Sequence, residues 1–102
     1  MTSLAETLAK DRRLVILRLL SEVPGYSLSA SMLTKAVRSM RHAVYDDTIA
    51  ADLVMLEQHT LVTREEESHN GKTLVFATLT RFGLEVANGR PHPMVDQPSP
   101  KF

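Results

Sequence analysis

The 102-residue sequence contains no cysteine, which excludes disulfides, thiolate metal sites and cysteine nucleophiles and fits a reducing cytoplasm. Net charge is missing too: twelve basic and twelve acidic residues cancel, so no overall charge draws the chain to nucleic acid or a membrane surface. The longest apolar run, residues 14–17, is far too short to cross a membrane, and charges at residues 10–13 interrupt any signal peptide. We therefore expect a cytoplasmic protein with no membrane partner.

Patterns typical of catalytic and cofactor sites are absent as well. The sequence has no glycine-rich phosphate loop and no Gly-x-Ser-x-Gly elbow. Glu65, Glu66 and Glu67 alternate between the faces of a predicted strand, so they cannot form a paired acid–base site. Metal-ligand spacing is not found among the four histidines, which are His42, His59, His69 and His92. The sequence predicts no enzyme, no cofactor and no metal site.

The composition, 43% hydrophobic, suffices for one small domain. Residues 1–89 carry the apolar periodicity. Residues 90–102 contain four prolines and few apolar side chains, so we expect them to be a flexible tail that buries little surface. A domain of this size is marginally stable alone, which makes a homodimer plausible.

The first predicted helix begins at the capping box Ser3-Leu-Ala-Glu6 and runs to about Glu22, before Pro24-Gly25. Residues 14–20 are apolar at six of seven positions, more than one buried stripe requires. Two explanations stay open. Either this helix is buried within its own domain, or its extra apolar face joins a second subunit. The dimer interface would then contain Leu4, Leu8, Val15, Leu19, Phe82 and Val86.

A short edge strand is expected over Tyr26–Leu28, followed by a second helix over about residues 29–41 with Ser27 or Ser29 as its cap. The buried stripe of this helix is predicted to comprise Met32, Leu33, Ala36, Val37 and Met40. The chain then turns through residues 41–45, where the helix-breaking signal is weak because neither glycine nor proline is present.

A third helix is predicted over Asp46–Gln58, where Ile49, Leu53 and Leu56 recur at helical spacing. Asn70-Gly71 then predicts a tight hairpin between strands at residues 61–67 and 73–80. A two-residue turn would place Val62 opposite Leu79 and Glu65 opposite Phe76. Thr80 can cap a last helix over residues 81–88, ended by Gly89.

The run from Thr48 to Val62, Thr-Ile-x-x-x-Leu-x-x-Leu-Glu-x-x-x-Leu-Val, resembles the signature of winged-helix regulators of the arsenical-repressor and multiple-antibiotic-repressor types. Leu79-Thr80-x-x-Gly83 is similar to the strand-to-helix join of those families. Residues 8–89 look like a small winged-helix protein of Mu-like transposable bacteriophages, in which Arg-Arg-Leu-Val-Ile-Leu-Arg-Leu-Leu (residues 12–20) and Pro-Gly-Tyr (24–26) recur. The fold expected is a mostly helical α+β winged helix-turn-helix, with a three-helix core, a two-stranded wing and a C-terminal helix.

Three parts of the sequence depart from this pattern. Thr60 replaces the glycine that usually ends the third helix, so this turn is expected to be strained or closed differently. Tyr45 replaces a small hydroxyl cap, and Asp46 or Asp47 is expected to take over capping. Residues 50–52 are Ala-Ala-Asp where DNA-reading relatives often carry a basic residue. The metal-sensing cysteines of arsenical repressors are absent, so that function is not carried over.

The resemblance implies a DNA-binding transcriptional regulator, encoded by a phage and acting as a homodimer in the cytoplasm of a bacterial host. Double-stranded DNA would be its partner. The residues nearest the bases would be Asp46, Asp47, Thr48, Ala51 and Gln58 of the third helix. The phosphate contacts would be Lys35, Arg38, Arg41 and His42 around the second helix, with Arg64, His69 and Lys72 on the wing.

An alternative function is a protein-interaction module that does not bind DNA. Residues 43–68 hold one basic and seven acidic residues, a net charge of −6. Such a surface repels phosphates and would suit a basic host or phage protein. A continuous positive band from the second helix to the wing tip would favour DNA binding, and its absence would favour the protein partner.

Overall fold

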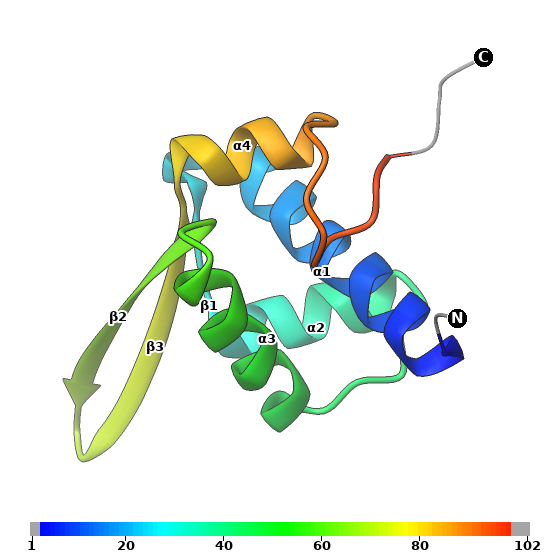
Figure 1. Cartoon of the computed structure of the whole chain (residues 1–102). Coiled ribbons are helices and arrows are strands. Elements are labelled where there is room, and N and C mark those ends of the chain that lie inside the picture. Colours follow the sequence, from blue (N-terminus) through cyan, green and yellow to red (C-terminus); the bar gives the residue numbers. More distant parts are fainter. Residues whose placement is uncertain (1–2, 99–102) are drawn as a thin grey trace.

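The structure, a computed structural model, describes residues 3–98 and confirms the mostly helical α+β class (Figure 1). Among these residues, no helix is long and apolar enough to cross a membrane. The elements are, in chain order, helix α1 (Leu4–Glu22), a 3-10 turn η1 (Pro24–Tyr26), strand β1 (Ser27–Ser29), helix α2 (Ala30–Ser39), helix α3 (Asp46–Gln58), strands β2 (Val62–His69) and β3 (Lys72–Leu79), and helix α4 (Arg81–Ala87).

Hydroxyl side chains begin three of the helices. Ser3 accepts the amide of Glu6 at 3.1 Å, and Ser29 accepts that of Met32 at 3.2 Å. Thr80 accepts the amide of Gly83 at 3.0 Å. These N-caps agree with the sequence prediction.

Helix α3 begins differently. Its N-cap is Tyr45, and no side chain caps its first amides, so the prediction that Asp46 or Asp47 would do so is wrong. Both aspartates lie in the first turn, where their charge is favourable near the positive end of the helix dipole.

The C-terminal ends of α2 and α3 are closed by residues in the left-handed region. Arg41 has φ 68° and Thr60 has φ 61°. The amides of Thr60 and Leu61 donate to the carbonyls of Glu57 and Leu56 at 2.9 Å each, which is a Schellman motif built on threonine instead of glycine. Thr60 thus takes the left-handed conformation that the usual glycine would adopt, and Arg41 explains how a turn without glycine or proline ends α2.

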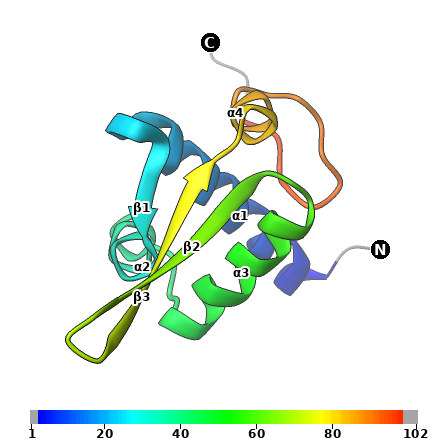
Figure 2. The same ribbon diagram turned by 90° about the vertical axis from the view of Figure 1, so that its left-hand side faces the viewer.

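The hairpin has the predicted register. Val62 pairs with Leu79, and Glu65 with Phe76, around a turn in which Asn70 and Gly71 have φ 51° and 78°. Strand β1 adds to the other side of β3, giving the antiparallel order β1-β3-β2. Figures 1 and 2 show β2 and β3 extending away from the helices.

The core forms where α1, α2 and α3 meet the base of the sheet. Ile16, Leu17 and Leu20 of α1 are fully buried. They pack in one cluster with Leu33 and Val37 of α2 and with the predicted stripe of α3, namely Ile49, Leu53 and Leu56.

The buried stripe predicted for α2 is too wide. Leu33 and Val37 are buried, but Met32 and Met40 are 50% and 55% exposed. Met32 lies within the first turn of α2 on its outer side, and Met40 is already the C-cap residue. The short helix therefore buries a narrow stripe, and the prediction that both methionines fill the core is wrong.

The C-terminal segment, residues 90–98, folds back over the helices (Figure 1). We call these residues the strap. Val95 is 3% exposed within the core cluster. The Asp96 amide donates to the carbonyl of Lys10 at 3.2 Å. Val95 departs from the expectation that this segment buries little, and backbone hydrogen bonds at Val95 and Asp96 tie the strap down. Residues 99–102 of the predicted tail lie outside the described residues.

Candidate nucleic-acid interface

The outer face of α3 is exposed beside the hairpin (Figure 2). Of the five residues predicted to lie nearest DNA bases, Asp46, Asp47, Ala51 and Gln58 are exposed, and Thr48 is half-buried. Ala50 and Val54 are also exposed on this helix. The face is therefore small and weakly polar, with its negative charge concentrated at the N-terminal end.

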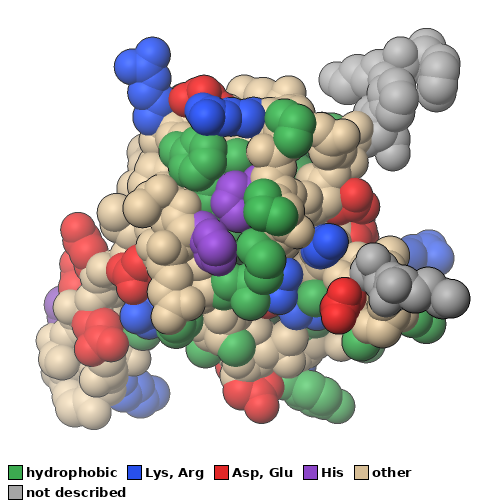
Figure 3. All heavy atoms as spheres, in the orientation of Figure 1, with side chains coloured by type: hydrophobic (Ala, Val, Ile, Leu, Met, Phe, Trp, Pro, Cys, Tyr) green, Lys and Arg blue, Asp and Glu red, His purple; other side chains and the backbone are tan. Residues whose placement is uncertain are grey.

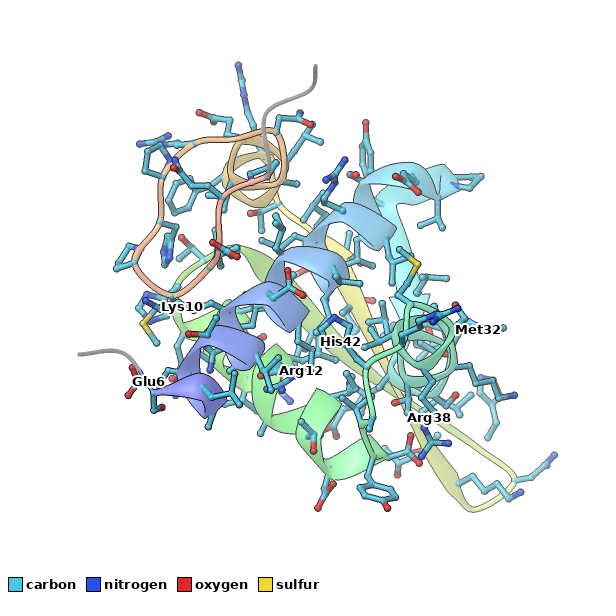
Figure 4. All side chains as sticks on the ribbon, turned by 90° about the vertical axis from the view of Figure 1, so that its right-hand side faces the viewer. Glu6, Lys10, Arg12, Met32, Arg38 and His42 are labelled. Carbon is cyan, nitrogen blue, oxygen red and sulfur yellow. The ribbon has the colours of Figure 1, made fainter. Side chains whose placement is uncertain are left out.

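Asp52 does not belong to the exposed acidic face that its sequence neighbours suggested. Its side chain is buried, with the residue 3% exposed, and it accepts hydrogen bonds from Arg12 and Arg13 of α1. Arg12 binds both carboxylate oxygens, through Nε and Nη2. The hydrogen bond to Asp52 raises the pKa of Arg12 above its usual value. This ion pair lies inside the molecule and connects α1 to α3; Figure 4 marks Arg12 on α1.

Glu57, the last acidic residue of α3, is also paired. Its carboxylate accepts the side chain of Arg64 at 3.0 Å and the backbone amide of Arg64 at 3.1 Å. Arg64 was predicted to contact phosphate from the base of the hairpin. The structure places it against Glu57 instead, half-buried. Two of the four acidic residues of α3 are thus neutralised by partners within the chain.

Exposed basic side chains lie on α2 and in the turn that follows it. Lys35, Arg38 and Arg41 are all exposed. Arg38 donates through Nε to the carbonyl of Val44 at 2.7 Å, and its guanidinium lies 5.6 Å from the ring centroid of Tyr45. Arg38 therefore shapes the loop before α3 while keeping its charge at the surface. The groove along this loop, about 450 Å³, is lined by Arg38, Arg41, His42, Ala43, Val44 and Tyr45.

His42 is oriented toward α1, away from the outer side of α2 where Arg38 lies (Figure 4). Its Nε2 lies 3.1 Å from Oδ2 of Asp11, and its side chain is largely covered. His42 lines the same groove as Arg38 and Arg41, but its imidazole is directed to Asp11 and not to the outer surface. In this position it connects the loop to α1.

The tip of the hairpin carries both signs of charge. Lys72 and His69 are exposed there, and His69 lies 3.5 Å from the Glu67 carboxylate. Glu65 and Glu66 are exposed farther along β2. Figure 3 shows acidic side chains along the hairpin and at the N-terminal end of α3. On this face of the molecule, no continuous positive band reaches the hairpin.

The residues predicted for a dimer interface lie on α1 and α4 and differ in how exposed they are. Leu4 and Leu8 are exposed on α1, and Val15 and Leu19 are half-buried farther along it. Phe82 is half-buried on α4, between Arg90 and His92 of the strap. Val86 is 1% exposed in the core of its own chain, so its assignment to a dimer interface is wrong.

Three residues were not among the predicted site residues: Arg12 and Arg13, which bind Asp52 inside the molecule, and Tyr45, which lies beside Arg38. The roles of the two arginines could have been suspected from Asp52, because it stands three residues after Ile49 and directly before Leu53, inside the apolar stripe of α3. A carboxylate buried at such a position needs hydrogen-bond donors or a positive partner, which the sequence offers on the basic residues of α1. No comparable signal marks Tyr45, whose ring is exposed beside Arg38 only because of how the loop folds.

No protein-family model matches the chain, and no curated protein sequence matches it.

Proposed function

We infer that the chain is a winged-helix protein that binds double-stranded DNA and regulates transcription. Helix α3 would approach the major groove, and the hairpin would be the wing. The sequence resemblance to proteins of Mu-like phages extends this proposal to a phage-encoded regulator in the cytoplasm of a bacterial host.

One observation carries the proposal: Lys35, Arg38 and Arg41 are exposed beside α3, while two of the four acidic residues of that helix are paired inside the chain. The basic side chains would hold phosphates on one side of the groove. Tyr45 adds a hydroxyl group next to them. Because α3 offers Ala50, Ala51 and Val54 toward the bases, we propose that phosphate contacts supply most of the affinity.

The test is fluorescence anisotropy of a labelled random duplex at increasing salt, with the double variant Lys35→Ala/Arg41→Gly. Glycine is chosen for position 41 because its φ is positive, so the charge is removed without backbone strain. Each phosphate contact contributes about 0.9 to the slope of log K against log salt, so losing two should reduce its magnitude by about 2.

The matched control is Arg18→Ala/Arg81→Ala, which removes two exposed positive charges from α1 and α4. Its slope should stay close to that of the wild type. Equal losses in both double variants would contradict a localised site and indicate an effect of net charge alone.

A second function is supported by the exposed carboxylates. Within residues 3–98, Asp46, Asp47, Glu65 and Glu66 make no ion pair. They lie on the N-terminal end of α3 and on β2, and would present a negative surface to a basic host or phage protein. In this proposal α3 never approaches DNA.

The two functions are separated by Asp46→Asn/Asp47→Asn. If α3 enters a groove, removing these charges should tighten duplex binding, because two carboxylates near phosphates are repulsive. Unchanged binding would place α3 away from the DNA and favour the protein partner. Binding of such a partner should be abolished by Asp46→Lys/Asp47→Lys, and retained binding would exclude this surface.

We also propose that the chain forms a homodimer through the outer face of α1. Leu8, Val15 and Leu19 fall on the same side of the helix, with Leu4 one turn before them. Leu4 and Leu8 are exposed on this side, whereas Val15 and Leu19 are half-buried against the core and line a groove with Met40 and the strap.

A further inference from the structure

The strap is held by contacts that meet at His92. Its ring lies edge-on to the ring of His59, the C-cap residue of α3, with centroids 5.1 Å apart. On the other side, its centroid lies 5.9 Å from that of Phe82 on α4. Its Nδ1 accepts the backbone amide of Met94 at 3.1 Å. Nδ1 therefore carries a lone pair and no proton when the strap is in place.

The residues just after His92 depend on this arrangement. The carbonyl of Met94 accepts Nη1 of Arg13 at 3.0 Å, and Val95 is buried in the core cluster. Val95 also forms an isolated β-bridge with His92 itself. Arg13 binds Asp52 as well, so the strap is joined through one arginine to the ion pair that connects α1 and α3.

The charges around His92 do not favour a positive imidazole. The basic side chains on the elements packed around the strap are Arg13 and Lys10 of α1 and Arg90 of the strap itself. The carboxylates on these elements are Glu6 of α1, Glu85 of α4 and Asp96 of the strap; Arg90 already pairs with Glu85 at 2.9 Å. In the described part of the chain, neither His59 nor His92 has a carboxylate within ion-pair distance.

We propose that His59 and His92 form an acid-sensitive latch that releases the strap from α1, α3 and α4. A solvent proton would bind Nδ1 of His92, which removes the acceptor for the Met94 amide and places a positive charge against His59. The strap would then lose its bond to Arg13 and expose Val95. Its release would also remove Asp96, Gln97 and Pro98 from one side of a groove, about 470 Å³, whose other side is formed by α1 and Met40. This proposal does not depend on DNA binding.

The direction of the pH effect follows from the site. Burial, and then the charge of His59, lower the pKa of His92 below its ordinary value. A histidine with a lowered pKa in the folded state stabilises that state above its ordinary pKa of about 6.5. This contribution falls as the pH drops below that value, and is lost as the pH falls through the lowered pKa. The strap should therefore be docked at neutral pH and released in weak acid.

The test is a pH titration of the full chain, from about pH 8 to about pH 5, followed by NMR. Two signals are observed together: the Hε1 proton of His92 and the ¹³C-labelled methyl groups of Val95. We expect the Val95 methyls to move to the shifts of an exposed valine with the same midpoint as His92. Val95 methyls that keep their docked shifts while His92 titrates would overturn the proposal, whatever the variants do.

Variants identify the groups responsible. In His92→Gln the amide oxygen can accept the Met94 amide without titrating, so Val95 should stay docked throughout. A release that persists in this variant would overturn the role of His92. Should His92→Gln be undocked already at neutral pH, His59→Gln decides. Losing the neighbouring charge should raise the midpoint of the His92 titration, because that charge lowers the pKa of His92; an unchanged midpoint contradicts the latch. The control is His69→Gln, on the hairpin, which should leave the titration unchanged.

Discussion

At the scale of the residue, Asp52 is the position where a charge inside the apolar stripe of α3 is balanced by two arginines. Removing one partner of a buried pair costs about 3 kcal/mol, since the other charges stay covered. We expect Asp52→Asn to lower the free energy of unfolding by that order, as measured by urea denaturation. Asp47→Asn, on the exposed side of the same helix, should change it by less than about 0.5 kcal/mol. Equal stabilities of the two variants would contradict a stabilising role for the pair.

Thr60 is the second residue with a measurable consequence. A side chain with a branched β-carbon in the left-handed region costs about 1–2 kcal/mol, whereas glycine adopts this region freely. Thr60→Gly should therefore stabilise the fold by about 0.5–1 kcal/mol, after the entropy that glycine loses on folding is deducted. Thr63→Gly, in the regular part of β2, should destabilise it. If both glycines destabilise alike, the strain at Thr60 is not significant.

At the scale of the element, the join between β3 and α4 depends on a close approach. The carbonyl of Leu61 lies 2.1 Å from where a β-carbon of residue 83 would stand, so only glycine fits there. Thr80, which caps α4, also donates to the carbonyls of Thr60 and Leu61 at 2.6 and 3.0 Å.

We expect Gly83→Ala to destabilise the protein by about 1–3 kcal/mol, because α4 must move away from Leu61. Thermal unfolding followed by circular dichroism measures the effect. Arg81→Ala, two residues earlier and exposed, is the matched control and should unfold close to the wild-type temperature. A Gly83→Ala variant as stable as this control would show that the join tolerates a wider spacing.

Some features of the helices and strands could be predicted from the sequence, and others could not. The bounds of α3 and the hairpin register were predictable, since apolar spacing and Asn70-Gly71 are local signals. The partners of Asp52, the orientation of His42 and the burial of Val95 were not, because each depends on segments far apart in the chain. The candidate site was predicted only in part for the same reason: Lys35 and Arg41 are exposed as expected, whereas Arg64 is occupied by Glu57.

At the scale of the whole molecule, the proposed dimer predicts a concentration-dependent mass. Sedimentation should show a dimer at high concentration for the wild type and a monomer for Leu8→Glu, because a charge on the outer face of α1 opposes its burial. Leu74→Glu, an exposed position on the hairpin, should leave the dimer intact. A wild-type monomer at high concentration would exclude the dimer, and dimers of Leu8→Glu would move the interface away from α1.

We propose that an electrically neutral chain binds DNA through a local group of basic residues beside α3. The most direct measurement is the affinity of the wild-type protein for a labelled random duplex as salt is raised. We expect binding at low salt that weakens steeply, with a slope of about −2 to −4 for the contacts of Lys35, Arg38, Arg41 and Lys72. No binding at low salt, or binding that is insensitive to salt, would contradict it.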